Sequence, residues 1–96
     1  MTNSNSITMD TVVAQTERLL TSELDGETVL MSLKSAAYFG LDSTAQHIWN
    51  LIAEPTRVAD LCERLVSDYE VERSDCEEHV VAFLTEMNAE GLIRVV

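Results

Sequence analysis

The sequence predicts an α+β domain in which a three-stranded antiparallel sheet is followed by three helices. Two short runs rich in β-branched and aromatic residues, 28–33 and 37–41, are separated by three residues, which is typical of a β-hairpin. Asp25-Gly26, just before these runs, is a strong signal for another hairpin turn. Three segments with the apolar period of an amphipathic helix follow. Because a small hairpin sheet is not stable alone, we expect the helices to cover it.

Length and charge limit the classes of function. The 96 residues suffice for one domain with a single hydrophobic core. Asp and Glu number 17 against 6 Lys and Arg, and the net charge of −11 repels the phosphates of nucleic acids and anionic membranes. The sequence shows neither the apolar run of about 18 residues that a membrane span needs nor a signal-peptide pattern. We therefore expect a cytoplasmic protein that binds neither nucleic acid nor membrane.

The N-terminal segment differs from the rest of the chain. Residues 1–14 are polar and their apolar residues have no period, so we expect a disordered tail, with the folded domain spanning residues 15–96. The first strand is predicted over residues 19–24. The run 28–33 then has a neighbour on each side, which leaves the strand 37–41 at an edge of the sheet.

Period-2 alternation assigns side chains of the hairpin to its two faces. The core face is predicted to carry Val29, Met31, Leu33, Ala37, Phe39 and Leu41. The opposite face is predicted to carry Leu30, Tyr38 and Gly40.

The first two helices follow the sheet directly. The first is expected to begin at Asp42-Ser43, where Ser43-x-x-Gln46 has capping-box spacing, and to end before Pro55. The second is expected to begin with Thr56 as its N-cap and to continue to residue 69 with one apolar stripe.

The third helix is expected to begin at a second capping box, Ser74-x-x-Glu77, and to end at Gly91. Residues 92–96 then either add a short strand or pack against the fold. On a helical wheel, one arc carries the expected core residues Cys76, Val80, Phe83, Leu84 and Met87. Val81 lies outside this arc, in a row with Glu77, Leu84 and Asn88, and it is interpreted either as an ordinary exposed valine or as the wall of a groove.

Residues with catalytic or metal-binding chemistry do not form complete sets. Cys76-x-x-His79 shares a helix face, but Cys62 and His47 are the only other soft ligands and neither belongs to a paired motif. A Cys–His nucleophile pair lacks an orienting group, and the carboxylates spread along helical surfaces. We therefore expect no catalysis, no metal and no cofactor.

Three strands followed by three helices resemble a winged helix-turn-helix, a shape that would suggest a DNA-binding regulator. The charge opposes this function. Residues 54–78 carry nine acidic side chains against three arginines, and the third helix opens with Asp75, Glu77 and Glu78, which would repel DNA phosphates.

Several motifs resemble the PqqD family. They are Asp25-Gly-Glu-x-Val29, Leu33-Lys-Ser-x-x-Tyr38-Phe-Gly-Leu41-Asp42, Ile48-Trp49, Phe83-Leu84 and Glu90-Gly-Leu-Ile93. Leu61-Cys62-x-x-Leu65 and Asp68-Tyr69-x-Val71 are most similar to discrete leader-binding proteins of lasso-peptide clusters. Ala36 departs from the glycine common in the family, and a left-handed backbone there would cost up to about 1 kcal/mol.

The resemblance implies a non-enzymatic domain that binds the leader of a ribosomally made precursor peptide. In this family the leader adds as a strand to the third strand and lies in a cleft closed by the third helix. The peptide-binding residues implied here are Ala36, Ala37, Tyr38, Phe39, Gly40, Leu41, Glu77, Val80, Val81, Leu84, Thr85 and Asn88. The partner would be a leader peptidase or another maturation enzyme.

The sequence is compatible with two other functions. One is a PqqD-type peptide chaperone that serves a radical-SAM enzyme, and the other is the winged-helix DNA-binding regulator. The free strand edges also leave open whether two copies pair into a homodimer.

Overall fold

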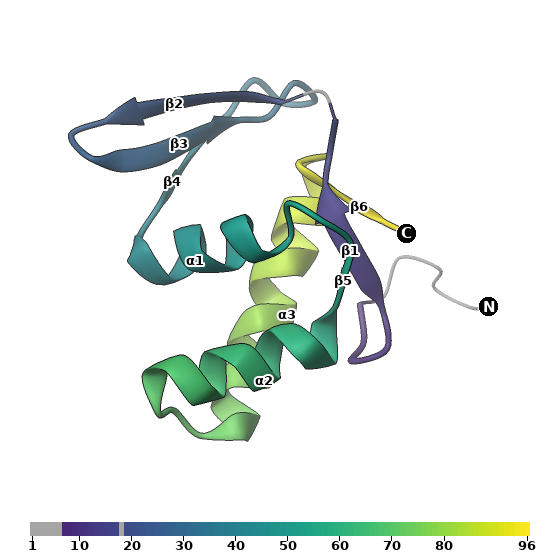
Figure 1. The fold of residues 1–96 in the computed structure, drawn as a ribbon. Coiled ribbons are helices and arrows are strands. Elements are labelled where there is room, and N and C mark those ends of the chain that lie inside the picture. The colour runs from purple at the N-terminus through teal and green to yellow at the C-terminus, as the bar shows by residue number, and fades with distance from the viewer. Residues whose placement is uncertain (1–6, 18) are drawn as a thin grey trace.

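A computed structural model describes residues 7–17 and 19–96. This part of the chain forms an α+β fold with three helices and two antiparallel three-stranded sheets, ordered β2-β3-β4 and β5-β1-β6 (Figure 1). The elements are β1 (Val12–Gln15), β2 (Leu20–Leu24), β3 (Glu27–Met31), β4 (Tyr38–Leu41), α1 (Ser43–Leu51), β5 (Thr56–Arg57), α2 (Val58–Tyr69), α3 (Arg73–Ala89) and β6 (Ile93–Val95).

The predicted three-stranded hairpin sheet is present, but one of its faces was assigned wrongly. Leu30 is fully buried and lies opposite Phe39, whereas Leu33 is exposed. The error comes from the register. Residues 30 and 39 are partners, so the even-numbered residues of β3 share a face with the odd-numbered residues of β4. For β4 the assignment holds, because Phe39 is partly buried against the core and Leu41 is buried.

The second sheet corrects the predicted tail of residues 1–14. β1 begins at Val12 and pairs with both β5 and β6, and Val13 is fully buried. Further upstream, the side chain of Ile7 is buried in the core cluster. A polar composition did not prevent order, because backbone pairing and a few apolar side chains anchor the segment. Residues 1–6, also part of the predicted tail, lie outside the described residues.

The helix caps differ from the predicted capping boxes. Asp42, not Ser43, caps α1, because its carboxylate accepts the Ala45 N–H at 2.8 Å. Thr56 does not cap α2 but lies in β5, where its hydroxyl donates to the Leu51 carbonyl at 3.0 Å. α3 begins at Arg73, so Ser74 lies inside the helix and does not cap it.

The start of α2 is capped by a distant part of the chain. Its N-cap residue, Arg57, makes no side-chain capping bond. The N–H groups of Val58 and Ala59 instead donate to the carbonyls of Thr11 and Met9, at 2.8 and 2.9 Å. The N-terminal segment thereby satisfies two helical donors that would otherwise be free.

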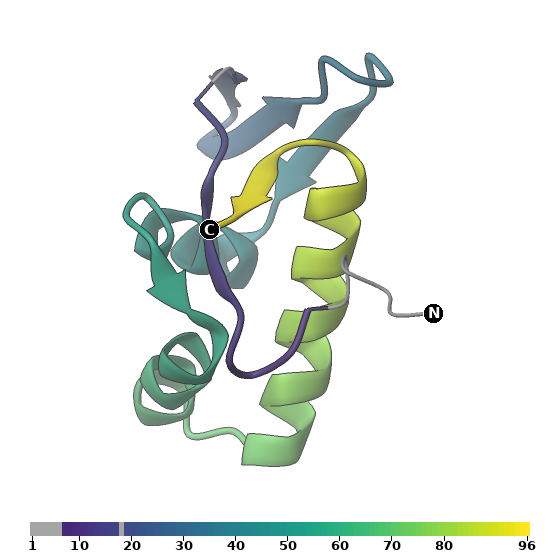
Figure 2. The ribbon, with the colours of Figure 1, turned by 90° about the vertical axis from the view of Figure 1, so that its right-hand side faces the viewer.

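The end of α3 follows the prediction closely. Gly91 has φ +73°, and its N–H donates to the Asn88 carbonyl at 3.1 Å. The Leu92 N–H donates to the Met87 carbonyl at 3.0 Å, which completes a Schellman motif. The turn buries Leu92 and directs β6 back along β1, so residues 92–96 do add a strand (Figure 2).

The apolar side chains of both sheets and all three helices meet in one core cluster. Within the described residues, none of the helices has the length and apolar content needed to cross a membrane.

Candidate peptide-binding site

The outer edge of β4 is open. β4 pairs with β3 on one side, and the described residues place no strand on its other side. The Ser32 N–H donates to the Ala37 carbonyl at 2.9 Å, which makes 32 and 37 a hydrogen-bonded pair. Because bonded and non-bonded pairs alternate in an antiparallel ladder, Phe39 and Leu41 direct their N–H groups toward β3. Tyr38 and Gly40 direct theirs outward, where a peptide strand could accept them.

Side chains of β4 alternate in the same way. Phe39 and Leu41 point to the core, while the Tyr38 side chain is 71% exposed on the opposite face. Gly40 lies beside Tyr38 in this outward-facing set and has no side chain to shield the edge. The strand therefore combines an anchored inner face with an accessible backbone edge.

The turn before β4 is held in an unusual conformation. Ala36 has φ +60°, the left-handed geometry in which alanine costs about 1 kcal/mol relative to glycine. Its N–H donates to the Ser32 carbonyl at 2.8 Å. The sequence-based prediction of a left-handed cost at this position applies to the observed backbone.

Hydrogen bonds fasten this turn to the C-terminal end of α3. The hydroxyl of the fully buried Ser32 donates to the Glu90 carbonyl at 2.8 Å. Lys34 Nζ donates to the Ala89 carbonyl at 3.1 Å, and Ser35 Oγ donates to Glu90 Oε1 at 2.6 Å. β4 and α3 are thus joined at one end, which fixes the distance between them there.

One flank of α3, which we call the Val81 flank, faces the N-terminal segment. Val81 and Met9 are both partly buried against the core cluster. A shallow hollow here is lined by Met9, Ser74, Glu77, Glu78, Val81 and Ala82. In Figure 2, the N-terminal segment passes in front of α3. Val81 therefore lines this hollow together with Met9 of the same chain.

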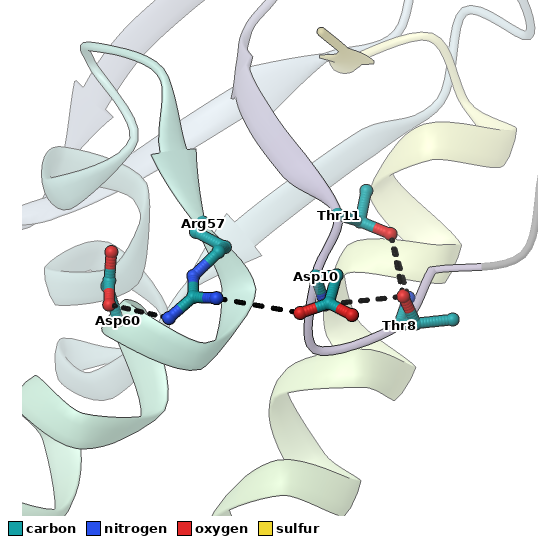
Figure 3. A network of polar contacts seen from close by, with 5 residues as sticks. All are labelled: Thr8, Asp10, Thr11, Arg57 and Asp60. Atoms are coloured by element: carbon teal, nitrogen blue, oxygen red, sulfur yellow. Dashed lines mark hydrogen bonds and ion pairs between the residues drawn. The ribbon is translucent and has the colours of Figure 1, made fainter.

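A network of polar contacts links the N-terminal segment to the start of α2 (Figure 3). Arg57 bridges Asp10 at 3.5 Å and Asp60 at 3.6 Å. The Thr8 N–H donates to the hydroxyl of Thr11 at 2.9 Å. All of these groups are exposed or near the surface, so they add little to the backbone caps on α2.

The other flank of α3, which we call the His79 flank, contains an open apolar pocket of about 440 Å³. Its walls come from three helices. α1 contributes Thr44 and Ile48, α2 contributes Leu65 and Tyr69, and the remaining lining residues are Val71, Glu72, Asp75, Cys76, His79 and Val80.

The structure separates the predicted site residues into three groups. Residues 36–41 are together, as the turn and the open edge. Val80 and Leu84 are buried in the core, and Val80 also lines the pocket. Glu77 and Val81 lie on the Val81 flank, and helical spacing puts Thr85 and Asn88 on the same side.

Sequence reasoning missed most of the pocket-lining residues. The usable signal was the row Glu72, Asp75, Cys76 and His79, which follows the helical spacing on the opposite side of the core arc from Val81. The contributions of α1 and α2 depend on tertiary packing, so no local pattern marks them.

The two cysteines lie close together inside the fold. Cys62 and Cys76 are free and buried, and the Cys76 thiol donates to the Cys62 carbonyl at 3.8 Å. Burial raises the pKa of Cys62 to about 11, so its thiolate is scarce near neutral pH. Among the described residues, no three His, Cys, Asp or Glu side chains are grouped to hold a metal ion.

A free strand edge beside a helix is the geometry of domains that bind a peptide by strand addition. The chain belongs to the PqqD family: the model of "Coenzyme PQQ synthesis protein D (PqqD)" matches residues 27–93.

Two solved structures resemble the fold, each with a TM-score of 0.72. The first, described as "TbiB1 in Complex with the TbiA(beta) Leader Peptide", is 27% identical, and the match covers 84% of this chain and 94% of that chain. The second, "Lasso peptide synthetase B1 complexed with the leader peptide", is 28% identical, with 85% and 96% covered. The comparison with curated proteins gives no match.

Proposed function

We propose that this protein binds the leader of a ribosomally made precursor peptide and presents it to a processing enzyme, a leader protease of a lasso-peptide pathway. The observation that carries the proposal is the open edge of β4, with the outward N–H groups of Tyr38 and Gly40. The two similar structures, both of proteins in complex with leader peptides, support the same function.

The edge provides a defined mode of binding. An added strand would exchange backbone hydrogen bonds with Tyr38 and Gly40, and each such bond contributes about 0.5–1.5 kcal/mol. These bonds do not depend on the side chains of the peptide. Choice of leader must therefore come from alternate peptide side chains, which point either toward α3 or toward the outer face of the sheet.

The role we propose is recognition without catalysis. The processing enzyme would provide the chemistry. The net charge of −11 would attract a basic leader and raise the association rate, an effect that falls with rising salt. We place this function in the cytoplasm, where precursor peptides are made.

A direct test is titration of the purified protein with a fluorescent leader from the precursor peptide encoded beside its gene. We expect saturable binding at physiological salt, with a scrambled leader of the same composition binding at least tenfold more weakly. A labelled DNA duplex tests the alternative of a winged-helix regulator. Binding of the duplex without binding of the leader would overturn the proposal.

The family match favours a second candidate, a chaperone that delivers its peptide to a radical-SAM enzyme. Both candidates use the same edge, so the processing enzyme must separate them. A leader protease whose cleavage rate rises with added protein would support the first. We also interpret the sheet β2-β3-β4 followed by three helices as winged helix-turn-helix-like, an interpretation that rests on element order alone.

A further inference from the structure

The sheet β2-β3-β4 has a second edge, on the outer side of β2. β2 pairs with β3 from Leu20 to Leu24, and the described residues place no strand on its other side. All of its residues are exposed, and its hairpin turn projects from the rest of the fold (Figure 1). The edge that we assign to the leader is β4, at the opposite end of the same sheet, so leader binding leaves the edge of β2 unused.

The backbone groups of β2 that face this edge belong to Thr21 and Glu23. The Ser32 N–H bonds toward β4, and successive residues of β3 alternate between their two neighbours, so Val29 bonds to β2. Val29 lies opposite Ser22, which therefore directs its N–H and C=O groups inward. Thr21 and Glu23, on either side of Ser22, direct theirs outward.

β2 lacks the features that usually protect a strand edge. Monomeric proteins blunt such edges with lysine, proline, a bulge or a covering segment. β2 pairs with β3 without a bulge and contains neither lysine nor proline. Leu20 and Leu24 are 54% and 62% exposed, and both lie on the outer face of the sheet, where Leu20 is in line with Met31 and Tyr38. Apolar surface therefore lies directly beside unpaired backbone groups.

β2 is complementary to itself when two copies run antiparallel about a two-fold axis at Ser22. Thr21 of each copy then lies opposite Glu23 of the other, and each such pair exchanges both backbone hydrogen bonds. On the outer face, Leu20 lies opposite Leu24 of the second copy. An axis at Thr21 would place Leu20 opposite a serine, and an axis at Glu23 would place two carboxylates directly opposite each other, which is destabilising. The axis at Ser22 is therefore the favoured register.

We propose that two copies of this chain associate through β2, with Ser22 on the two-fold axis. The pairing produces one continuous sheet of order β4-β3-β2-β2-β3-β4, so β4 remains free at both ends and the dimer can carry two leader peptides. Self-association itself needs only the edge of β2, so it does not depend on the proposed function. Five residues on each side bury less than the roughly 1,200 Å² of a stable interface, and we therefore expect monomer and dimer in exchange.

The first test is analytical ultracentrifugation of the full-length protein over a hundredfold range of concentration. We expect the average mass to rise from that of a monomer toward that of a dimer. Because each copy carries a net charge of −11, salt screens their repulsion, and the dissociation constant should fall at least threefold from low to high salt. A monomer at every concentration and in both salts would overturn the proposal.

Two leucine variants locate the interface. Leu24→Glu places a carboxylate opposite Leu20 of the second copy, and we expect it to weaken the dimer at least tenfold. Leu33→Glu is the matched control, because Leu33 is 57% exposed but follows β3 and lies outside the proposed interface. If Leu33→Glu dissociates the dimer and Leu24→Glu does not, the copies meet through another surface and the proposal is wrong.

Proline substitutions compare the two edges of the sheet. Thr21→Pro removes an outward N–H from β2 and should abolish the dimer while changing leader affinity less than twofold. Tyr38→Pro removes an outward N–H from β4 and should leave the dimer intact. Loss of the dimer in folded Tyr38→Pro, with association retained in Thr21→Pro, would assign self-association to β4 and contradict the proposal.

Ser22→Cys reports the register. Opposite residues of a non-hydrogen-bonded pair have Cα atoms about 4.5 Å apart, within the range of a disulfide. Glutathione disulfide serves as the oxidant: two thiols form the intermolecular disulfide, and the oxidant is reduced to two glutathione molecules. We expect cross-linking at least tenfold faster than for Leu24→Cys, which lies opposite Leu20 of the second copy. The wild type is the control for the buried Cys62 and Cys76.

Equal cross-linking rates for Ser22→Cys and Leu24→Cys would exclude this register. Circular dichroism verifies the folding of each variant. If Thr21→Pro unfolds, Leu24→Glu and the two cysteine variants decide, because all three change exposed side chains of β2.

Discussion

The two flanks of α3 have similar sequences but different surroundings. Each combines carboxylates with a few apolar residues: Glu77 and Val81 on one side, Asp75 and Val80 on the other. The Val81 flank is partly covered by Met9 of the N-terminal segment, which shares the lining of a shallow hollow with it. The His79 flank keeps an open apolar pocket. The position of a binding surface therefore depends on what the rest of the chain leaves uncovered, and the helix alone does not determine it.

The covered flank is occupied for a structural reason. The carbonyls of Met9 and Thr11 receive the first N–H groups of α2, which has no side-chain cap. Moving the N-terminal segment away would expose these donors and the side chain of Ile7. On the His79 flank, residues of α1, α2 and α3 line the pocket, and residues 7–11 are not among them.

The largest expected effect comes from proline substitutions in β4, which test whether the open edge of this strand binds the peptide. Phe39→Pro removes an N–H that bonds to β3 and a side chain packed on the core, so we expect the domain to unfold. Tyr38→Pro removes an outward N–H and should leave the domain folded with at least tenfold weaker leader binding. Circular dichroism and leader titration measure both. Normal leader affinity in folded Tyr38→Pro would exclude strand addition at β4.

Ile7→Ala tests the N-terminal segment, whose Ile7 side chain packs into the core cluster. The side chain is buried, and its truncation should lower the free energy of unfolding by about 2–3 kcal/mol. Leader affinity of the folded protein should not change, since the segment lies on the other flank. Urea unfolding monitored by Trp49 fluorescence gives the stability. A large loss of leader affinity at full folding would show that the N-terminal segment takes part in binding.

Val81→Asp and His79→Arg compare the flanks directly. Val81→Asp buries part of a charge against the core, so we expect a loss of about 1–2 kcal/mol in stability and little change in affinity. His79→Arg changes an exposed residue and should leave stability intact while weakening a basic leader three- to tenfold at low salt. The opposite pattern would place the peptide on the Val81 flank.

The smallest effect is expected for Arg57→Ala. Its two ion pairs, with Asp10 and Asp60, involve exposed side chains and are longer than 3.4 Å. Such pairs contribute little, and we expect a change below about 0.5 kcal/mol in the free energy of unfolding. A loss above 1.5 kcal/mol would mean that this network, and not the backbone caps, holds the N-terminal segment on α2.

The sequence predicted an element correctly where its residue pattern is long or where a turn is strongly marked. It predicted the hairpin sheet with its open third strand, the three helices, the buried residues of α3 and the closing glycine at position 91. The face of β3 was missed because the register depends on the left-handed turn at Ala36, where no glycine marks the conformation.

Short and non-local features were beyond sequence reasoning. β5 has two residues and β6 has three, too few to show a period. The capping of α2 by Met9 and Thr11 joins residues that are 50 and 47 positions apart in the sequence. The same limit applies to the candidate site. The edge at residues 38–41 was predicted, while the pocket needs α1, α2 and α3 together, so the wheel of one helix could not indicate it.

The pairing of β1 with β6 has a mechanical consequence. Val13 lies opposite Val95, and the Val96 N–H donates to the Val12 carbonyl at 2.8 Å, so the last residue is bonded at the very end of the ladder. A force applied at Val96 would load these bonds one after another, because they are perpendicular to the strands. Peeling resists force less than shearing the whole ladder at once.

An unfolding motor that pulls from this end would therefore remove β6 first and meet the Schellman turn at Gly91 next. Unwinding the end of α3 would then break the bonds from Ser32, Lys34 and Ser35 that fasten the hairpin turn to it. Under tension, β4 would separate from α3 while α1 and α2 were still folded. Release of a bound peptide would be one of the earliest events as the molecule is pulled apart.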